Sequence, residues 1–183
     1  MIGYIRRFAR EERAAVAFET VLMTPILVWA FVGSFVFFDA YRVYNTSVKT
    51  TYMVADMLSR QTNMVFGHDI QGLADVSNSI IRGSNEVEMR VSQIAMINGS
   101  YNVDWSHGVN GAARLFNSNL DAIVDRLPDM PNGERVILVE TFVDYVAPFD
   151  IGLTVARFDN FTLSRPRYAG QVPFDPDGSP PTS

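Results

Sequence analysis

The side chains that most often carry out chemistry are scarce in this chain of 183 residues. It has no cysteine and two histidines, His68 and His107, so a zinc site or a Ser/His/Asp triad would have to use one of these two rings. Asp104 and Ser106 lie near His107 in the sequence, but neighbouring strand residues point to opposite faces, so this proximity supplies no triad geometry. We therefore predict a protein that is not an enzyme, with no catalytic residue, metal ion or cofactor.

Two pairs of carboxylates could in principle act together. Glu140 and Asp144 stand four residues apart in an alternating segment, which separates them by about 13 Å on one face of a strand and is too far for a shared proton or for glycosidase chemistry. We expect both on a solvated face. The segment that contains Asp175 and Asp177 lacks most of the ligand residues of a calcium-binding loop.

Glu19 is the carboxylate in the most unusual position, because the 19 residues that follow it carry no charge. As a helix they rise about 28 Å, close to the thickness of a bilayer core. We predict a transmembrane helix over residues 15–38 that contains Pro25 and Gly33, both of which membrane helices tolerate. Either Glu19 marks the interfacial edge, compensated by Arg13 or a lipid headgroup, or it has a specific partner.

The N-terminus, residues 1–14, forms a basic leader in which four arginines oppose two glutamates. The positive-inside rule places this leader in the cytoplasm and sends the remaining chain across the membrane. The apolar stretch is longer than that of a secretory signal and no small-x-small cleavage site follows it, so we expect it to persist as an anchor. A balance of 15 basic against 20 acidic residues, a net charge of −5, argues against nucleic-acid binding.

The helical period continues beyond the membrane segment, through residues 39–62. Apolar and aromatic side chains recur there at steps of three and four: Tyr41, Tyr44, Val48, Tyr52, Ala55 and Leu58. This stripe either packs on the chain's own domain, which we favour, or contacts other subunits.

Residues 63–169 have the pattern of a small α+β domain, and residues 170–183, with four prolines, that of a disordered tail. We expect an antiparallel sheet with two short helices against one face. The expected strands are 86–97, with a phase shift near Gln93, then 101–106 after an Asn98-Gly99 turn, 136–145 and 158–164; the expected helices are 68–82 and 115–127.

The stretch from Glu12 to Pro25 resembles the N-terminus of class III prepilins, specifically the TadE/TadG-like minor pseudopilins of the tight-adherence (Tad, type IVb/c) pilus system. Members of that family have a short basic leader that ends at a small residue, usually glycine, and a glutamate fifth in the mature chain. Four further stretches fit the family in the same order: Val91–Ile94, Val103–Ser106, Val136–Tyr145 and Arg165–Arg167.

The resemblance implies cleavage by a prepilin peptidase between Ala14 and Ala15, so that Glu19 becomes the fifth residue and pairs with an N-terminal amine. It implies a pilin-like fold and a minor pseudopilin that takes part in assembly or initiation of a Tad-type pilus, with a role in adhesion. The implied partners are the peptidase, other Tad pilins and pseudopilins, the inner-membrane assembly platform and membrane lipid.

The implied location is the bacterial inner membrane, with a single pass, a cytoplasmic N-terminus, a periplasmic domain and a possible place in the extracellular pilus. Because Ala14 stands where the family usually has glycine, an alternative stays open. In it the chain is an unprocessed single-pass anchor that presents a periplasmic binding domain.

Overall fold

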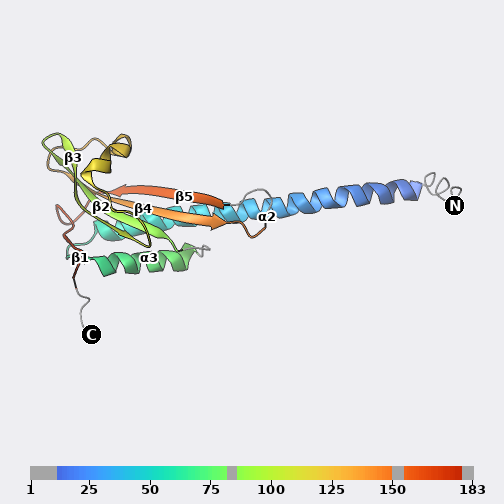
Figure 1. Ribbon diagram of the computed structural model, residues 1–183, viewed down its shortest axis with the longest axis horizontal. Coiled ribbons are helices and arrows are strands. Elements are labelled where there is room, and N and C mark those ends of the chain that lie inside the picture. Colours follow the sequence, from blue (N-terminus) through green and yellow to red (C-terminus); the bar gives the residue numbers. More distant parts are fainter. Residues whose placement is uncertain (1–11, 82–85, 150–154, 179–183) are drawn as a thin grey trace, which may run out of the picture. The chain divides into compact units, whose positions relative to one another are not determined.

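The computed structural model describes residues 12–81, 86–149 and 155–178 (Figure 1). Two compact units divide the chain: one holds the residues up to Tyr41 with Ala147–Thr154, and the other holds Arg42–Val146 with Val155–Ser183. The elements are α2 (Glu12–Ser59), β1 (Val65–Phe66), α3 (Gly67–Ile81), β2 (Glu88–Ile97), β3 (Ser100–Val109), the 3-10 helices η1 (Asn117–Ala122) and η2 (Val124–Arg126), β4 (Arg135–Val146), β5 (Val155–Ser164) and β6 (Phe174–Asp175).

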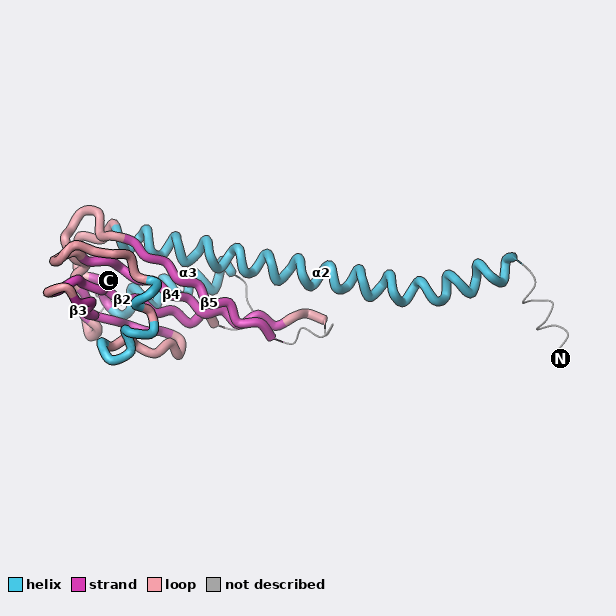
Figure 2. Tube along the Cα trace, turned by 90° about the horizontal axis from the view of Figure 1, so that it is seen from above, coloured by secondary structure: helices cyan, strands magenta, loops and turns pink. Residues whose placement is uncertain are grey.

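Helix α2 is a single element of 48 residues, drawn as one continuous helix in Figure 2. Its residues up to Tyr41 belong to the first unit and its remaining residues to the second. The predicted continuation of the apolar segment into residues 39–62 is therefore confirmed, although the helix ends at Ser59 rather than at 62. Its last turn tightens there: the amide of Arg60 donates to the carbonyl of Met57 over 3.3 Å, and that of Gln61 donates to Leu58 over 3.1 Å.

The predicted packing of the apolar stripe along α2 is confirmed at Ala55 and Leu58, which are buried, but it is wrong for the three tyrosines. Tyr41 and Tyr52 are 66% and 60% exposed, and Tyr44, which contacts Phe158 edge-on at 5.5 Å, is 44% exposed. The other buried positions of this half of the helix lie outside the predicted stripe: Val43, Ser47, Thr50, Thr51, Val54 and Ser59. Small polar residues were overlooked because a hydrophobic pattern gives them no weight, yet their hydroxyls bond back to the helix and across to the sheet.

The four-stranded sheet has the order β3-β2-β4-β5, and every neighbouring pair is antiparallel. The predicted turn between its first two strands is confirmed: Asn98 and Gly99 both have positive φ, at 52° and 77°, as a tight hairpin requires. The predicted phase shift is confirmed too, because the register of β2 against β3 slips between Gln93 and Ile94.

The sheet separates two hydrophobic clusters, since successive residues of a strand face opposite sides. Ile137 and Val139 of β4 join the cluster formed with α2 and α3, whereas Val136 and Leu138 join the cluster formed with residues 115–130. The expectation of two short helices against one face is thus wrong. Helices α2 and α3 cover one face, and the η1–η2 segment packs on the other.

Residues 115–127, predicted as one amphipathic helix, form the two 3-10 helices η1 and η2 instead. Neither has a side-chain hydrogen bond at its N-cap. The segment is rich in short polar side chains that compete with the backbone for hydrogen bonds: Asn117, Ser118, Asn119, Asp121 and Asp125. Its apolar residues Leu120, Ile123 and Leu127 are nevertheless buried as predicted.

The predicted disordered tail is also wrong over residues 170–178. Strand β6 pairs in parallel with β1, matching Val65 with Phe174 and Phe66 with Asp175. Val172 is fully buried, and its backbone bonds to two side chains of the sheet. Apolar anchors spaced between the prolines explain this order, because each buries its surface while the prolines limit the entropy lost. Residues 179–183 lie outside the described residues.

Candidate functional site

The first half of α2 exposes large apolar side chains all round. Phe31 is 74% exposed, Phe18 68% and Trp29 64%. The stretch Val16–Ser59 has a mean hydropathy of 2.2 in its most apolar window, so by length and composition this helix could cross a membrane. Such exposure would be unfavourable in water, and it indicates a surface that lipid or another helix covers.

The polar side chains of this apolar stretch are satisfied within the helix. Thr20 donates to the carbonyl of Val16 over 2.8 Å, Thr24 to that of Thr20 over 2.6 Å, and Ser34 to that of Ala30 over 2.9 Å. No hydroxyl of these three residues therefore needs a partner from water. The helix passes through Pro25 and Gly33 without interruption.

The predicted processing and pairing residues all lie at the start of α2. Glu19 is exposed and lies in the first two or three turns of the described helix. Ala14 and Ala15 belong to the same helix, but their side chains are outside the described residues, as are residues 1–11 of the leader. Within residues 16–178 as described, no side chain forms an ion pair with Glu19.

A groove of about 760 Å³ opens beside the C-terminal turns of α2 and is bounded on the other side by α3. Its apolar lining comes from Met57, Leu58, Met64, Val65, Leu73 and Val76. Met57 and Met64 are 45% and 48% exposed, and thioether side chains adapt readily to different contacts. Sequence reasoning missed this groove, because the methionines lie on either side of a helix end whose position only the structure gives.

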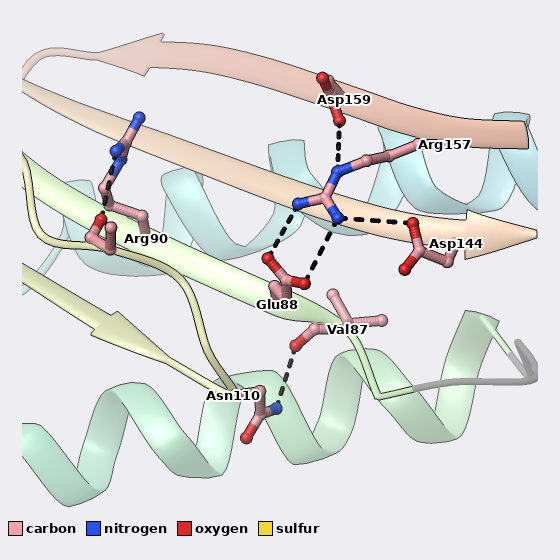
Figure 3. Close-up of polar contacts among 8 residues, drawn as sticks. Val87, Glu88, Arg90, Asn110, Asp144, Arg157 and Asp159 are labelled. Atoms are coloured by element: carbon pink, nitrogen blue, oxygen red, sulfur yellow. Dashed lines mark hydrogen bonds and ion pairs between the residues drawn. The ribbon is translucent and has the colours of Figure 1, made fainter.

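The face of the sheet opposite α2 carries a network of ion pairs (Figure 3). Arg157 of β5 contacts three carboxylates from three strands: Glu88 at 2.8 Å, Asp144 at 3.5 Å and Asp159 at 3.3 Å. The hydrogen bonds that Arg157 donates to the carboxylate of Glu88 are the largest influence on the guanidinium, and they raise the pKa of Arg157. The guanidinium also lies over the ring of Phe142, 5.1 Å from its centroid.

Glu140 departs from the prediction of a solvated face. Its side chain is only 6% exposed and forms an ion pair of 2.6 Å with Arg90 of the neighbouring strand. Arg90 also donates to the carbonyl of Ala113 over 3.2 Å. Since Glu140 binds Arg90 while Asp144 binds Arg157, the two carboxylates belong to different ion pairs (Figure 3).

The two histidines contact aromatic rings of the paired strands β1 and β6. His107, one residue beyond the predicted end of its strand, lies within β3, and its ring is 5.3 Å from that of Phe174. Burial, and to a lesser extent the charge of Arg114, lower the pKa of His107. His68 stacks on Phe66 at 5.4 Å. As expected, Asp69 serves the start of α3, where it accepts a hydrogen bond from the amide of Phe66 over 2.9 Å.

The residues considered for a triad have other partners. Ser106 lies 2.9 Å from the hydroxyl of Ser92 and accepts a hydrogen bond from the amide of Leu115. Asp104 binds Arg135 at 2.8 Å and the amide of Gln93 at 2.8 Å. In the described part of the chain, no group of three or more His, Asp or Glu side chains could hold a metal ion.

Comparison with protein-family models, curated proteins and solved structures finds no match for this chain. The functional assignment therefore rests on the residues themselves. The surfaces best suited to contacts with other molecules are the apolar half of α2 and the groove at its far end.

Proposed function

We propose that the chain is a minor pseudopilin that takes part in the assembly or initiation of a Tad-type pilus and contributes to adhesion. The observation that carries this proposal is helix α2. One continuous helix exposes apolar side chains around its first half, begins that half with the carboxylate of Glu19, and buries its second half in a folded α+β unit. A simple tether needs no such continuity, whereas a subunit that packs through its helix does.

Glu19 supplies the electrostatic part of the proposal. Cleavage after Ala14 would create an α-amine on Ala15, about one helical turn before Glu19. An ammonium and a carboxylate at the membrane face form a charge-assisted hydrogen bond, within one chain or between neighbours, and this offsets the cost of placing Glu19 next to lipid. Cleavage would also remove the four arginines that hold the N-terminus in the cytoplasm, so the helix could leave the bilayer during assembly.

The second half of α2 offers further contact surface for other subunits. Tyr41 and Tyr52 are exposed, and exposed aromatic side chains are the kind that contribute strongly to protein interfaces. The groove beside Met57 is apolar as well. These features support the alternative role of the tyrosine stripe, as a surface that meets other pilins or the assembly platform.

Replacement of Glu19 tests the proposal in cells that make the pilus. We expect Glu19→Ala to insert into the membrane in normal amount but to abolish assembly, measured as pili on the cell surface. Asp39→Asn, at the other end of the apolar segment, is the matched control and should assemble. Normal piliation by Glu19→Ala would refute the proposal.

A second candidate function is an unprocessed single-pass anchor that presents a periplasmic binding domain. Ala14 favours it, because the related prepilins usually have glycine at the residue before the cut. In this function the leader stays attached, Glu19 is an interfacial residue, and Glu19→Ala changes neither location nor binding.

A further inference from the structure

The C-terminal strap, residues 171–178, contains strand β6 and a turn at residues 176 and 177, and it docks into a site that other parts of the domain build. The amide of Val172 donates to the side-chain carbonyl of Gln93 over 2.7 Å, and the indole of Trp105 donates to the carbonyl of Val172 over 2.9 Å. The amide of Val65 donates to the carbonyl of Pro173 over 2.9 Å. Each of these hydrogen bonds is made to a backbone atom of the strap, as happens when a strand is added to a sheet edge.

Two side chains give the strap its register in this site. Val172 is fully buried, and Phe174 stacks on the ring of Trp105 with a centroid distance of 4.5 Å and an interplanar angle of 17°. Beyond them, Gly178 lies so close to Phe66 that an added Cβ would be 1.9 Å from its ring. The site therefore recognises an extended segment with the pattern Val-x-Phe, followed by a glycine four residues later.

The docking site is costly to leave empty. Gln93 is 2% exposed and its amide is held by Asp104 over 2.8 Å, so its carbonyl oxygen is fixed in place for the strap. Without a strap, this oxygen and the indole N–H of Trp105 would both lose the backbone partners that hold them in the structure. The site therefore favours exchange of one strap for another over release of the strap into solvent.

The residues that connect the strap to the sheet, Tyr168 to Gln171, would allow such an exchange. The last backbone hydrogen bond before it is donated by Arg167 to Ser59, at 2.8 Å. From Tyr168 to Gln171 the described chain makes no backbone–backbone hydrogen bond, Tyr168 is 70% exposed, and nothing lies within 4 Å of a Cβ added at Gly170. These residues can change direction without breaking packing.

We propose that this site is an interaction surface for a second copy of the chain, whose Val172-Pro173-Phe174 segment replaces the site's own strap. The exchanged state makes the same contacts as the closed one, so its population depends on the effective concentration of copies. Copies held side by side in one membrane would exchange straps and become linked at their domains. This inference does not depend on cleavage of the leader, and it holds for a pilus subunit and for a permanent anchor alike.

Cysteine cross-linking of the full-length chain in membranes tests the exchange, because the chain has no cysteine of its own. Phe66 and Asp175 are partners in the β1–β6 ladder, close enough for a disulfide. Two differently tagged variants, Phe66→Cys and Asp175→Cys, are made in the same cells, where neither alone can form this disulfide within one chain. The matched control replaces Asp175→Cys with Asp125→Cys, on a different surface.

We expect a disulfide-linked heterodimer of Phe66→Cys with Asp175→Cys, in roughly tenfold or greater yield over the control, since strap exchange would place these two cysteines in register whereas random collision would not. The double variant Phe66→Cys/Asp175→Cys on one chain shows that the paired positions fold correctly, by forming the disulfide within the chain or with a neighbour. An intramolecular disulfide in the double variant, with no heterodimer above the control, would overturn the exchange. No disulfide in either experiment would overturn the docking site itself.

Discussion

The hydroxyl of Thr51 on helix α2 lies 2.6 Å from that of Thr141 on β4, a hydrogen bond that is wholly buried between the helix and the sheet. The side-chain amide of Asn160 joins it, donating to Thr141 over 3.1 Å and to Ser47 over 3.0 Å. A buried polar network with specific partners fixes the register of two surfaces more strictly than apolar packing does. It therefore sets how far along the sheet the second half of α2 lies.

This network predicts a non-additive effect of two substitutions. Thr51→Val leaves Thr141 with fewer partners, so we expect it to lower the free energy of unfolding by about 1–3 kcal/mol. The double variant Thr51→Val/Thr141→Val should lose less than the sum of the single variants, because an apolar pair replaces a polar one. Chemical denaturation of the detergent-solubilised chain measures both, and strict additivity would show that the two hydroxyls act independently.

The ion pairs of Arg90 and of Arg157, on the face of the sheet opposite α2, should contribute differently to stability. Glu140→Ala would leave Arg90 unpaired at a site where both side chains are mostly buried, and should cost about 3 kcal/mol. Arg157→Ala removes ion pairs from a guanidinium that is 44% exposed, and should cost at most about 1 kcal/mol. Equal losses in thermal or urea unfolding would contradict this ranking.

His107 should make stability depend on pH. Burial lowers its pKa in the folded state below the ordinary value of 6.5, so the unfolded chain takes up this proton first. The stability contributed by neutral His107 is complete above pH 6.5 and is lost as the pH falls through the lowered pKa. Arg114 adds to the cost of a second positive charge there.

The check is the melting temperature between pH 7.5 and pH 5. His107→Gln should flatten the acid side of the profile. An acid slope that is unchanged in His107→Gln would contradict this assignment.

Loss of the ring of Phe174 should weaken the docking of the strap. Phe174→Ala removes the stack on Trp105, and we expect about 1–3 kcal/mol less stability together with a change in tryptophan fluorescence. Measured in a Trp29→Phe background, the signal comes from Trp105 alone, because the chain has two tryptophans. Unchanged emission would mean that the strap does not rest on Trp105.

Local patterns were sufficient to predict the long helix and the core strands. The uncharged run after Glu19 corresponds to α2, and the alternation of Val136–Tyr145 corresponds to β4. Each could be predicted because one local sequence pattern is enough to identify the element. The Asn98-Gly99 turn and the slip near Gln93 were visible for the same reason.

Contacts between distant residues explain what the sequence could not predict. Glu140 is buried because Arg90 lies opposite it, 50 residues earlier in the chain. Ser47 and Thr51 are buried because Asn160 and Thr141 accept or donate their hydrogen bonds. The strap is ordered because Gln93 and Trp105 hold Val172, and no local composition reveals that.

The central claim, that this chain is a processed pseudopilin, is tested most directly by its N-terminal sequence and intact mass in native membranes. The account predicts a chain that begins at Ala15, with or without an N-methyl group, so that Glu19 is the fifth residue. A chain that begins at Met1 or Ile2 would contradict it and identify the protein as a permanent membrane anchor.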